Sequence, residues 1–107
     1  MKMPESEARL VAIVKFAQGL HARPAVQLVE TAMAFSSDIQ IIKDDLAVDA
    51  KSVLQVLTLG ATCGTSLTVI ARGSDAEAAV KAVTEIIESE HDEVAKPDTS
   101  NAGSDLL

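Results

Sequence analysis

Residues 64–83 read GTSLTVIARGSDAEAAVKAV, and within this stretch a strand pattern leads directly into a helical pattern. Apolar and mostly β-branched residues mark a strand over 66–72: Leu67, Val69 and Ile70. Ser74 is followed three residues later by Glu77, which is the spacing of a capping box and predicts the start of a helix. That helix gathers its apolar residues on one face: Ala79, Val80, Val83, Ile86 and Ile87. Such a helix must bury this face, and a sheet offers the surface for it.

Upstream of this stretch the apolar period changes several times, and each change marks a new element. The nearly continuous apolar run 9–16 fits a buried strand. From Ala22 the period is helical, with one apolar stripe made of Ala25, Leu28, Val29 and Ala32. Short β-branched runs predict strands at 38–43 and 46–49, joined by a turn at 44–45.

A second capping-box spacing, Ser52 to Gln55, predicts a short helix that ends at about Leu57. The complete order is therefore strand, helix, strand, strand, short helix, strand, helix. We expect an α+β fold, an open sandwich in which one largely antiparallel sheet is covered by the helices on one face.

The charge balance excludes several classes of function. The chain has 107 residues, of which 9 are basic and 16 acidic, and its net charge is −7. Nucleic acids and anionic membranes bind basic surfaces, so we expect neither as a partner. Phe16 and Phe35 are the only aromatic residues, too few for a base-stacking surface. No apolar run approaches the roughly 18 residues of a membrane helix, so we expect no membrane insertion.

The composition along the chain predicts one domain between two flexible ends. Residues 1–7 hold a proline and polar groups without a period, and we expect a flexible N-terminus there. The domain then spans 8–89, and the polar, turn-rich residues 90–107 form an acidic, disordered tail. Residues 88–107 contain six acidic residues and one lysine, so most of the net charge belongs to the tail and the domain is close to neutral.

The cysteine content and the start of the chain indicate a cytoplasmic protein. Cys63 is the only cysteine, so it forms no internal disulfide and no two-cysteine metal pair. A free thiol suits a reducing compartment. Met1 is followed by an acidic stretch instead of the basic and apolar regions of a signal peptide. We expect no metal and no bound cofactor.

Residues with chemical potential are concentrated in Gly19-Leu20-His21-Ala22-Arg23-Pro24-Ala25, between the first predicted strand and the first predicted helix. Gly19 permits a sharp backbone turn. Pro24 suits the first helical turn, where its missing N–H costs no hydrogen bond. His21 therefore lies at or just before the helix cap.

This arrangement fits phosphoryl transfer. The unpaired amides at a helix N-terminus and its positive dipole end both favour an anion, so the backbone of Ala22 and Arg23 offers a phosphate site. The Arg23 guanidinium adds a cation whose planar donors suit phosphate oxygens. The same dipole end disfavours an imidazolium, so we expect a neutral His21 ring with one nitrogen able to act as a nucleophile.

The sequence also resembles a known family at these residues. GLHARPA, residues 19–25, resembles the active-site signature of the HPr family, the histidine-containing phosphocarriers of the bacterial phosphoenolpyruvate-dependent sugar phosphotransferase system. AKSVLQVLTLG, residues 50–60, resembles the second signature of the family, and residues 64–83 resemble its last strand and helix. The resemblance covers about residues 8–89 and implies a four-stranded antiparallel open-faced sandwich with three helices.

The resemblance also implies partners and roles. Enzyme I would phosphorylate His21 on its Nδ1, or pros, nitrogen, with Arg23 stabilising the phosphate, and IIA domains of sugar permeases would then receive the group. Ser52 matches a serine that a kinase/phosphorylase modifies in some bacteria, although the same serine is equally a plain helix cap. The chain would be a monomeric protein substrate in a relay more than a stand-alone enzyme.

A carrier of this kind needs an apolar surface around its histidine, because water must be kept from the transfer. We expect an exposed share of four residues to supply it: Val26, Val53, Leu54 and Leu57. The sequence departs from the family pattern on the first helix, where Glu30 and Met33 stand in the region of lysines, and at Asp44-Asp45, where glycine or asparagine is common. The missing lysines alter the electrostatic match to acidic partners.

Two rival functions stay open. The first is a regulatory or nitrogen-branch paralogue of the same fold, whose phosphorylation at His21, and at Ser52 if it is modified, is read by regulatory proteins. The second is a non-catalytic module that uses the helix N-terminus to hold an anion, since a histidine near a helix start is commonly a capping or surface residue.

Overall fold

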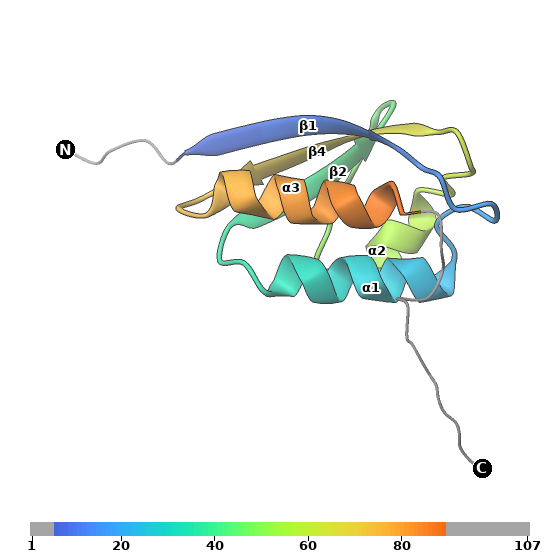
Figure 1. Cartoon of the computed structure of the whole chain (residues 1–107), viewed down its shortest axis with the longest axis horizontal. Coiled ribbons are helices and arrows are strands. Elements are labelled where there is room, and N and C mark those ends of the chain that lie inside the picture. The colour runs from blue at the N-terminus through green and yellow to red at the C-terminus, as the bar shows by residue number, and fades with distance from the viewer. Residues whose placement is uncertain (1–5, 90–107) are drawn as a thin grey trace, which may run out of the picture.

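The computed structural model describes residues 6–89, which form one four-stranded sheet with three helices on one face (Figure 1). The elements in chain order are β1 (Glu7–Ile13), α1 (Ala22–Met33), β2 (Asp38–Lys43), β3 (Leu46–Asp49), α2 (Val53–Thr58), β4 (Ser66–Arg72) and α3 (Ala76–Ile87). The strand order is β1-β4-β2-β3, and every neighbouring pair is antiparallel. This confirms the predicted α+β open sandwich and the order of its elements.

β4 is one of the two inner strands of the sheet, with β2, and its side chains alternate between the two faces of the sheet. Leu67, Val69 and Ala71 are fully buried and belong to the core between the sheet and the helices. The stripes predicted on the two long helices belong to the same core, because nearly all of their members are buried: Ala25, Leu28, Val29 and Ala32 on α1, and Ala79, Val80, Val83 and Ile87 on α3. Ile86, the remaining member of the α3 stripe, is only partly buried against the core. Side chains alternate between the two faces of a strand, and they recur every 3.6 residues along a helix. The apolar sides of the sheet and of the helices can therefore face each other in one core.

The strand predicted over 9–16 is present, but it is shorter at its C-terminal end than predicted and it is not buried. β1 ends at Ile13, and Val11 is 60% exposed. β1 is an edge strand, and the three helices lie on one face of the sheet (Figure 1), so the strand's side chains on the other face are not covered by a helix of the described residues. Apolar character alone does not reveal which faces of a strand are covered. Val14 and Phe16 are buried as expected, but in the connection that follows the strand.

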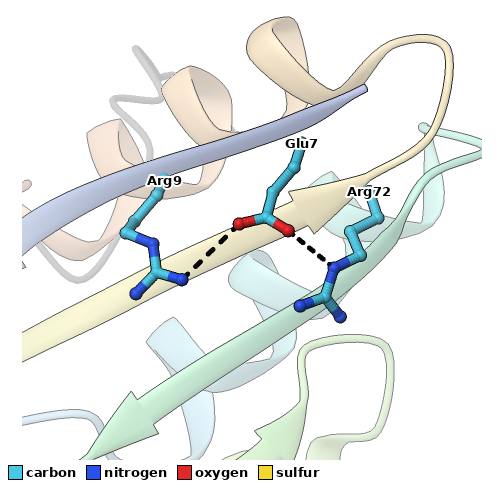
Figure 2. A network of polar contacts seen from close by, with 3 residues as sticks. All are labelled: Glu7, Arg9 and Arg72. Atoms are coloured by element: carbon cyan, nitrogen blue, oxygen red, sulfur yellow. Dashed lines mark hydrogen bonds and ion pairs between the residues drawn. The ribbon is translucent and has the colours of Figure 1, made fainter. Parts of the chain in front are cut away.

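Two residues of the predicted flexible N-terminus, Ser6 and Glu7, make contacts with the sheet. The Gly73 amide donates to the Ser6 carbonyl at 2.9 Å, and Glu7 pairs with Arg72 at the start of β1. The Glu7 carboxylate also accepts from Arg72 Nε at 2.9 Å and contacts Arg9 Nη2 at 3.5 Å, and Figure 2 shows it between the two guanidinium groups. The hydrogen bond from Arg72 lowers the pKa of Glu7. Residues 1–5 and the predicted tail 90–107 lie outside the described residues.

The helix α3 begins differently from the prediction. Its N-cap is Asp75 instead of Ser74, and the Asp75 side chain makes no cap hydrogen bond. The carboxylate accepts instead from the Ser36 amide at 2.9 Å, from the Ser37 amide at 3.0 Å and from the Ser37 hydroxyl. Asp75 therefore connects the start of α3 to the segment between α1 and β2, and these hydrogen bonds, with that from the Ser37 hydroxyl as the largest, lower its pKa to about 2.

Within residues 6–89, no helix has the length and apolar character needed to cross a bilayer.

The Asp75 contacts predict an acid-dependent contribution to stability. Asp75→Asn removes the charge that the serine donors stabilise, so its free energy of unfolding at pH 7 falls below that of the wild type. Because the folded-state pKa is about 2 and the ordinary value is 3.8, the wild-type advantage is complete above about pH 4 and shrinks as the pH falls towards 2. Urea unfolding at pH 7, 4 and 2.5 measures the difference. Asp45→Asn, in the exposed β2–β3 turn, is the control, and an advantage of Asp75 that stays constant at pH 2.5 would contradict the assignment.

Candidate functional site

The segment that carries the histidine leaves β1 and turns sharply before α1. Gly19 has a φ of +76°, a conformation that L-amino acids with side chains rarely adopt. Its amide donates to the Phe16 carbonyl at 2.9 Å, and the His21 amide donates to the Gly19 carbonyl at 3.0 Å. A Cβ atom at Gly19 would lie 2.5 Å from the Ala61 carbonyl oxygen, so this position needs glycine for space as well as for φ.

His21 is the N-cap residue of α1. Its backbone is extended, with φ −89° and ψ −164°, and its side chain makes no cap hydrogen bond. Its carbonyl accepts from the Ala25 amide at 3.0 Å, the first turn of the helix. Helix geometry leaves the amides of Ala22 and Arg23 without acceptors inside the helix, and Pro24 has no N–H. His21 thus lies at the donor end of the helix.

The surface around His21 is open. His21 is half-buried and Arg23 exposed, and both border a shallow depression that is also lined by Ala22, Val26 and Gln27. The depression contains the predicted histidine, the predicted guanidinium and the two backbone positions predicted to bind phosphate. An imidazole, a guanidinium group and the first amides of α1 thus border one small surface, and such a combination can bind an anion such as a phosphoryl group.

The four predicted docking residues divide into two groups. Leu54 is 78% exposed and Val26 is 41% exposed, whereas Val53 and Leu57 are partly buried against the core. Val26 lines the depression at His21, and α1 and α2 pack against each other. Figure 1 shows α2 close to the end of α1 at which His21 lies. Exposed apolar side chains therefore lie at the depression, on α1, and on the neighbouring helix α2.

Ser52 is the N-cap of α2, as the spacing predicts. Its hydroxyl accepts from the Gln55 amide at 3.3 Å. The reciprocal half of the capping box is absent, because Gln55 Oε1 accepts instead from the Asp49 amide at 2.9 Å. Ser52 belongs to a different helix from His21, and its side chain is half-buried.

One contact of the segment that carries His21 is not predicted from the sequence. The Leu20 amide, directly before His21, donates to the Ala61 carbonyl at 2.9 Å. Every residue has a carbonyl, so no sequence pattern marks Ala61. The only signal was the glycine at position 19, which this close approach requires.

Among residues 6–89, no group of His, Cys, Asp or Glu side chains is placed to hold a metal ion. Cys63 is exposed and makes no disulfide.

Comparison with known proteins identifies relatives over most of the chain. The family model described as the PTS HPr component phosphorylation site matches residues 9–89. A phosphocarrier protein HPr of Treponema pallidum is 36% identical over 75 residues, which cover 70% of this chain and 85% of that protein. A multiphosphoryl transfer protein of Xanthomonas campestris is 45% identical over 76 residues, 71% of this chain, although the match spans only 9% of that protein.

Solved structures show the same architecture. A crystal structure of a phosphocarrier protein HPr from Bacillus anthracis superposes with a TM-score of 0.74 at 35% identity, covering 78% of this chain and 99% of that one. The solution structure of Crh, the catabolite repression HPr of Bacillus subtilis, superposes with a TM-score of 0.62 at 33% identity, covering 78% of this chain and 100% of that one.

The turn at Gly19 predicts a sharp sensitivity to substitution. Gly19→Ala places a Cβ against the Ala61 carbonyl and strains a positive φ, so it should lower the free energy of unfolding by about 1–3 kcal/mol. Gly60→Ala is the matched control, because Gly60 also has a positive φ but nothing lies within 4 Å of its Cβ position. Urea unfolding of both variants measures the difference. Equal losses would show that the contact with Ala61 is not a constraint.

Proposed function

The chain belongs to the HPr family, the phosphocarriers of the phosphotransferase system, and on this premise we propose that it accepts a phosphoryl group on His21 from phosphorylated enzyme I and passes it to IIA domains of sugar permeases. The observation that carries the proposal is the position of His21 at the N-terminal end of α1, beside Arg23 and the amides of the first turn. The proposed nucleophile is Nδ1, the pros nitrogen.

The transfer requires one bond to form and one to break. The lone pair of Nδ1 forms the new bond to phosphorus, while the bond between phosphorus and the donor breaks and its electron pair leaves with the donor. The three phosphoryl oxygens remain on phosphorus and stay negatively charged. Arg23 and the amides of Ala22 and Arg23 stabilise that charge. The step reverses when an acceptor nucleophile replaces the donor, so the carrier needs no bound cofactor.

The shape of the site supports a protein partner. The depression at His21 is too open to exclude water by itself, and water must be kept from the transfer. Val26 and Leu54 offer apolar surface that a docking protein covers while its own reacting group reaches His21. Arg23 lies beside Val26, and it adds a cation that an acidic partner surface complements. The exposed free thiol of Cys63 suits action in the reducing cytoplasm.

A regulatory role is the second candidate, and the Ser52 geometry is the observation that favours it. A hydroxyl at the N-cap of α2 places a phosphate at the positive end of the helix, where its charge is tolerated. The modified residue would lie next to Val53 and Leu54, so its effect would be felt by partners docking on α2. The kinase/phosphorylase of this family is the proposed enzyme. The similarity to the catabolite repression HPr of Bacillus subtilis is consistent with this role.

Phosphorylation of His21 is tested with phosphoenolpyruvate and purified enzyme I. The wild type should gain one acid-labile phosphate, and His21→Ala should gain none, as measured by intact mass and by acid treatment. His91→Ala is the control, because His91 is the only other histidine and should leave the labelling unchanged. Labelling that persists in His21→Ala would refute the carrier assignment. A wild type that binds phosphate without forming the acid-labile bond would favour the anion-binding module.

Phosphorylation of Ser52 is tested with ATP and a purified HPr kinase/phosphorylase. An acid-stable phosphate should form on the wild type and not on Ser52→Asn, which keeps a capping oxygen but lacks the hydroxyl. Ser74→Ala removes another exposed serine and should leave the modification in place. If no acid-stable phosphate forms on the wild type, Ser52 is a helix cap alone.

A further inference from the structure

We propose that Thr65 is a positioning residue for His21, acting through the turn 62–65 and the Ala61 carbonyl. The expected effect on phosphoryl transfer rests on the proposed function. The positioning of His21 itself is a property of the fold. Neither Thr65 nor the turn belongs to the motif around His21, and both lie more than forty residues after His21 in the chain.

The Thr65 side chain closes the turn. Its Oγ1 accepts from the Thr62 amide at 3.1 Å and lies 3.2 Å from the Thr62 hydroxyl. The Thr65 amide donates to the Thr62 carbonyl at 3.0 Å. The turn is attached to the end of β1 by two further hydrogen bonds, from the Val14 amide to the Thr65 carbonyl at 2.9 Å and from the Gly64 amide to the Val14 carbonyl at 2.8 Å. Residues 62–65 are therefore held by hydrogen bonds within the turn and by hydrogen bonds to Val14 after β1.

The turn 62–65 also fixes the Ala61 carbonyl, which accepts a hydrogen bond from the segment that carries His21. Ala61 is only 4% exposed, directly precedes the turn, and accepts the Leu20 amide at 2.9 Å. The missing Cβ of Gly19 would lie 2.5 Å from the same oxygen and 3.1 Å from the Thr62 Cα atom. With so little space, a shift of Ala61 or Thr62 must be passed on to 19–20, and from there to the backbone of His21.

Positioning of this kind matters because His21 is an N-cap residue. Its extended φ and ψ decide where the imidazole lies relative to the amides of Ala22 and Arg23. A nucleophile displaced by a fraction of an ångström from its productive position loses rate, even though the residues themselves are unchanged. The Thr65 hydroxyl therefore influences the reaction without touching the phosphoryl group.

Loss of the hydroxyl should leave the domain folded. Thr62 is exposed, so water can replace the acceptor that its amide loses, and the backbone hydrogen bonds of the turn remain. Thr65→Val keeps the shape of the side chain and removes only the acceptor. Thr65→Ser keeps the hydroxyl and is the conservative control.

The experiment compares the two variants with the wild type. Steady-state phosphorylation by enzyme I should show kcat about tenfold lower in Thr65→Val, with KM changed less than about twofold because Val26 and Leu54 are untouched. Thr65→Ser should stay within about twofold of the wild type in both constants. By NMR, the Leu20 amide should exchange faster with solvent, and the His21 ring resonances should shift, in Thr65→Val but not in Thr65→Ser. Thermal unfolding checks that both variants are folded at the assay temperature.

Three results would overturn the proposal. Thr65→Val could transfer at the wild-type rate, Thr65→Ser could lose as much rate as Thr65→Val, or the Leu20 exchange and His21 resonances could be unchanged in Thr65→Val. Failure of the proposed function is recognised separately, because the wild type would then accept no phosphate from enzyme I. In that case the NMR comparison alone decides whether the Thr65 hydroxyl sets the position of His21.

Discussion

Antiparallel pairing along both sides of β4 is the interaction on which the rest of the structure depends. β4 pairs with β1 on one side from Glu7↔Arg72 to Ile13↔Ser66, and with β2 on the other from Asp38↔Arg72 to Ile42↔Thr68. Its two neighbours come from the first half of the chain, so the sheet closes only when a late segment inserts between two early ones. The register of β1 on β4 also fixes where the connection to α1 begins, since Val14 continues the pairing to Thr65.

The site is a consequence of that register at one end of the sheet. The segment 14–21, which follows β1, lies at the end of the sheet at which the chain enters β4. There it contacts the segment before β4 through Gly19 and Ala61. The backbone next to His21 is thus held by a hydrogen bond to a distant part of the sequence, while the other residues around the depression come from α1 itself. Residues close to His21 in the sequence form its surroundings, and residues distant in the sequence hold the backbone beside it.

This division explains what the sequence could and could not predict. Periodicity identified the seven elements, and the spacing of glycine, histidine, arginine and proline located the candidate site, because both are encoded locally. The exposure of Val11 was missed because apolarity does not say which face of an edge strand is covered. The start of α3 was misplaced because Asp75 binds Ser37, 38 residues away, and no local spacing reports such a contact. The contact with Ala61 was missed for the same reason.

The hydrogen bond between the Ile13 amide and the Glu88 carboxylate, at 2.9 Å, has a consequence for how the protein meets other chains. β1 is an edge strand with exposed apolar side chains, and such edges invite a further strand from another molecule. The Glu88 carboxylate accepts a hydrogen bond from an amide that a foreign strand would need for pairing. The Lys15 amide donates to the Ile87 carbonyl at 3.4 Å. Charged Glu7 and Arg9 lie at the other end of the same strand. Charge and occupied amides at both ends of β1 thus disfavour the addition of a foreign strand, although Val11 between them is exposed.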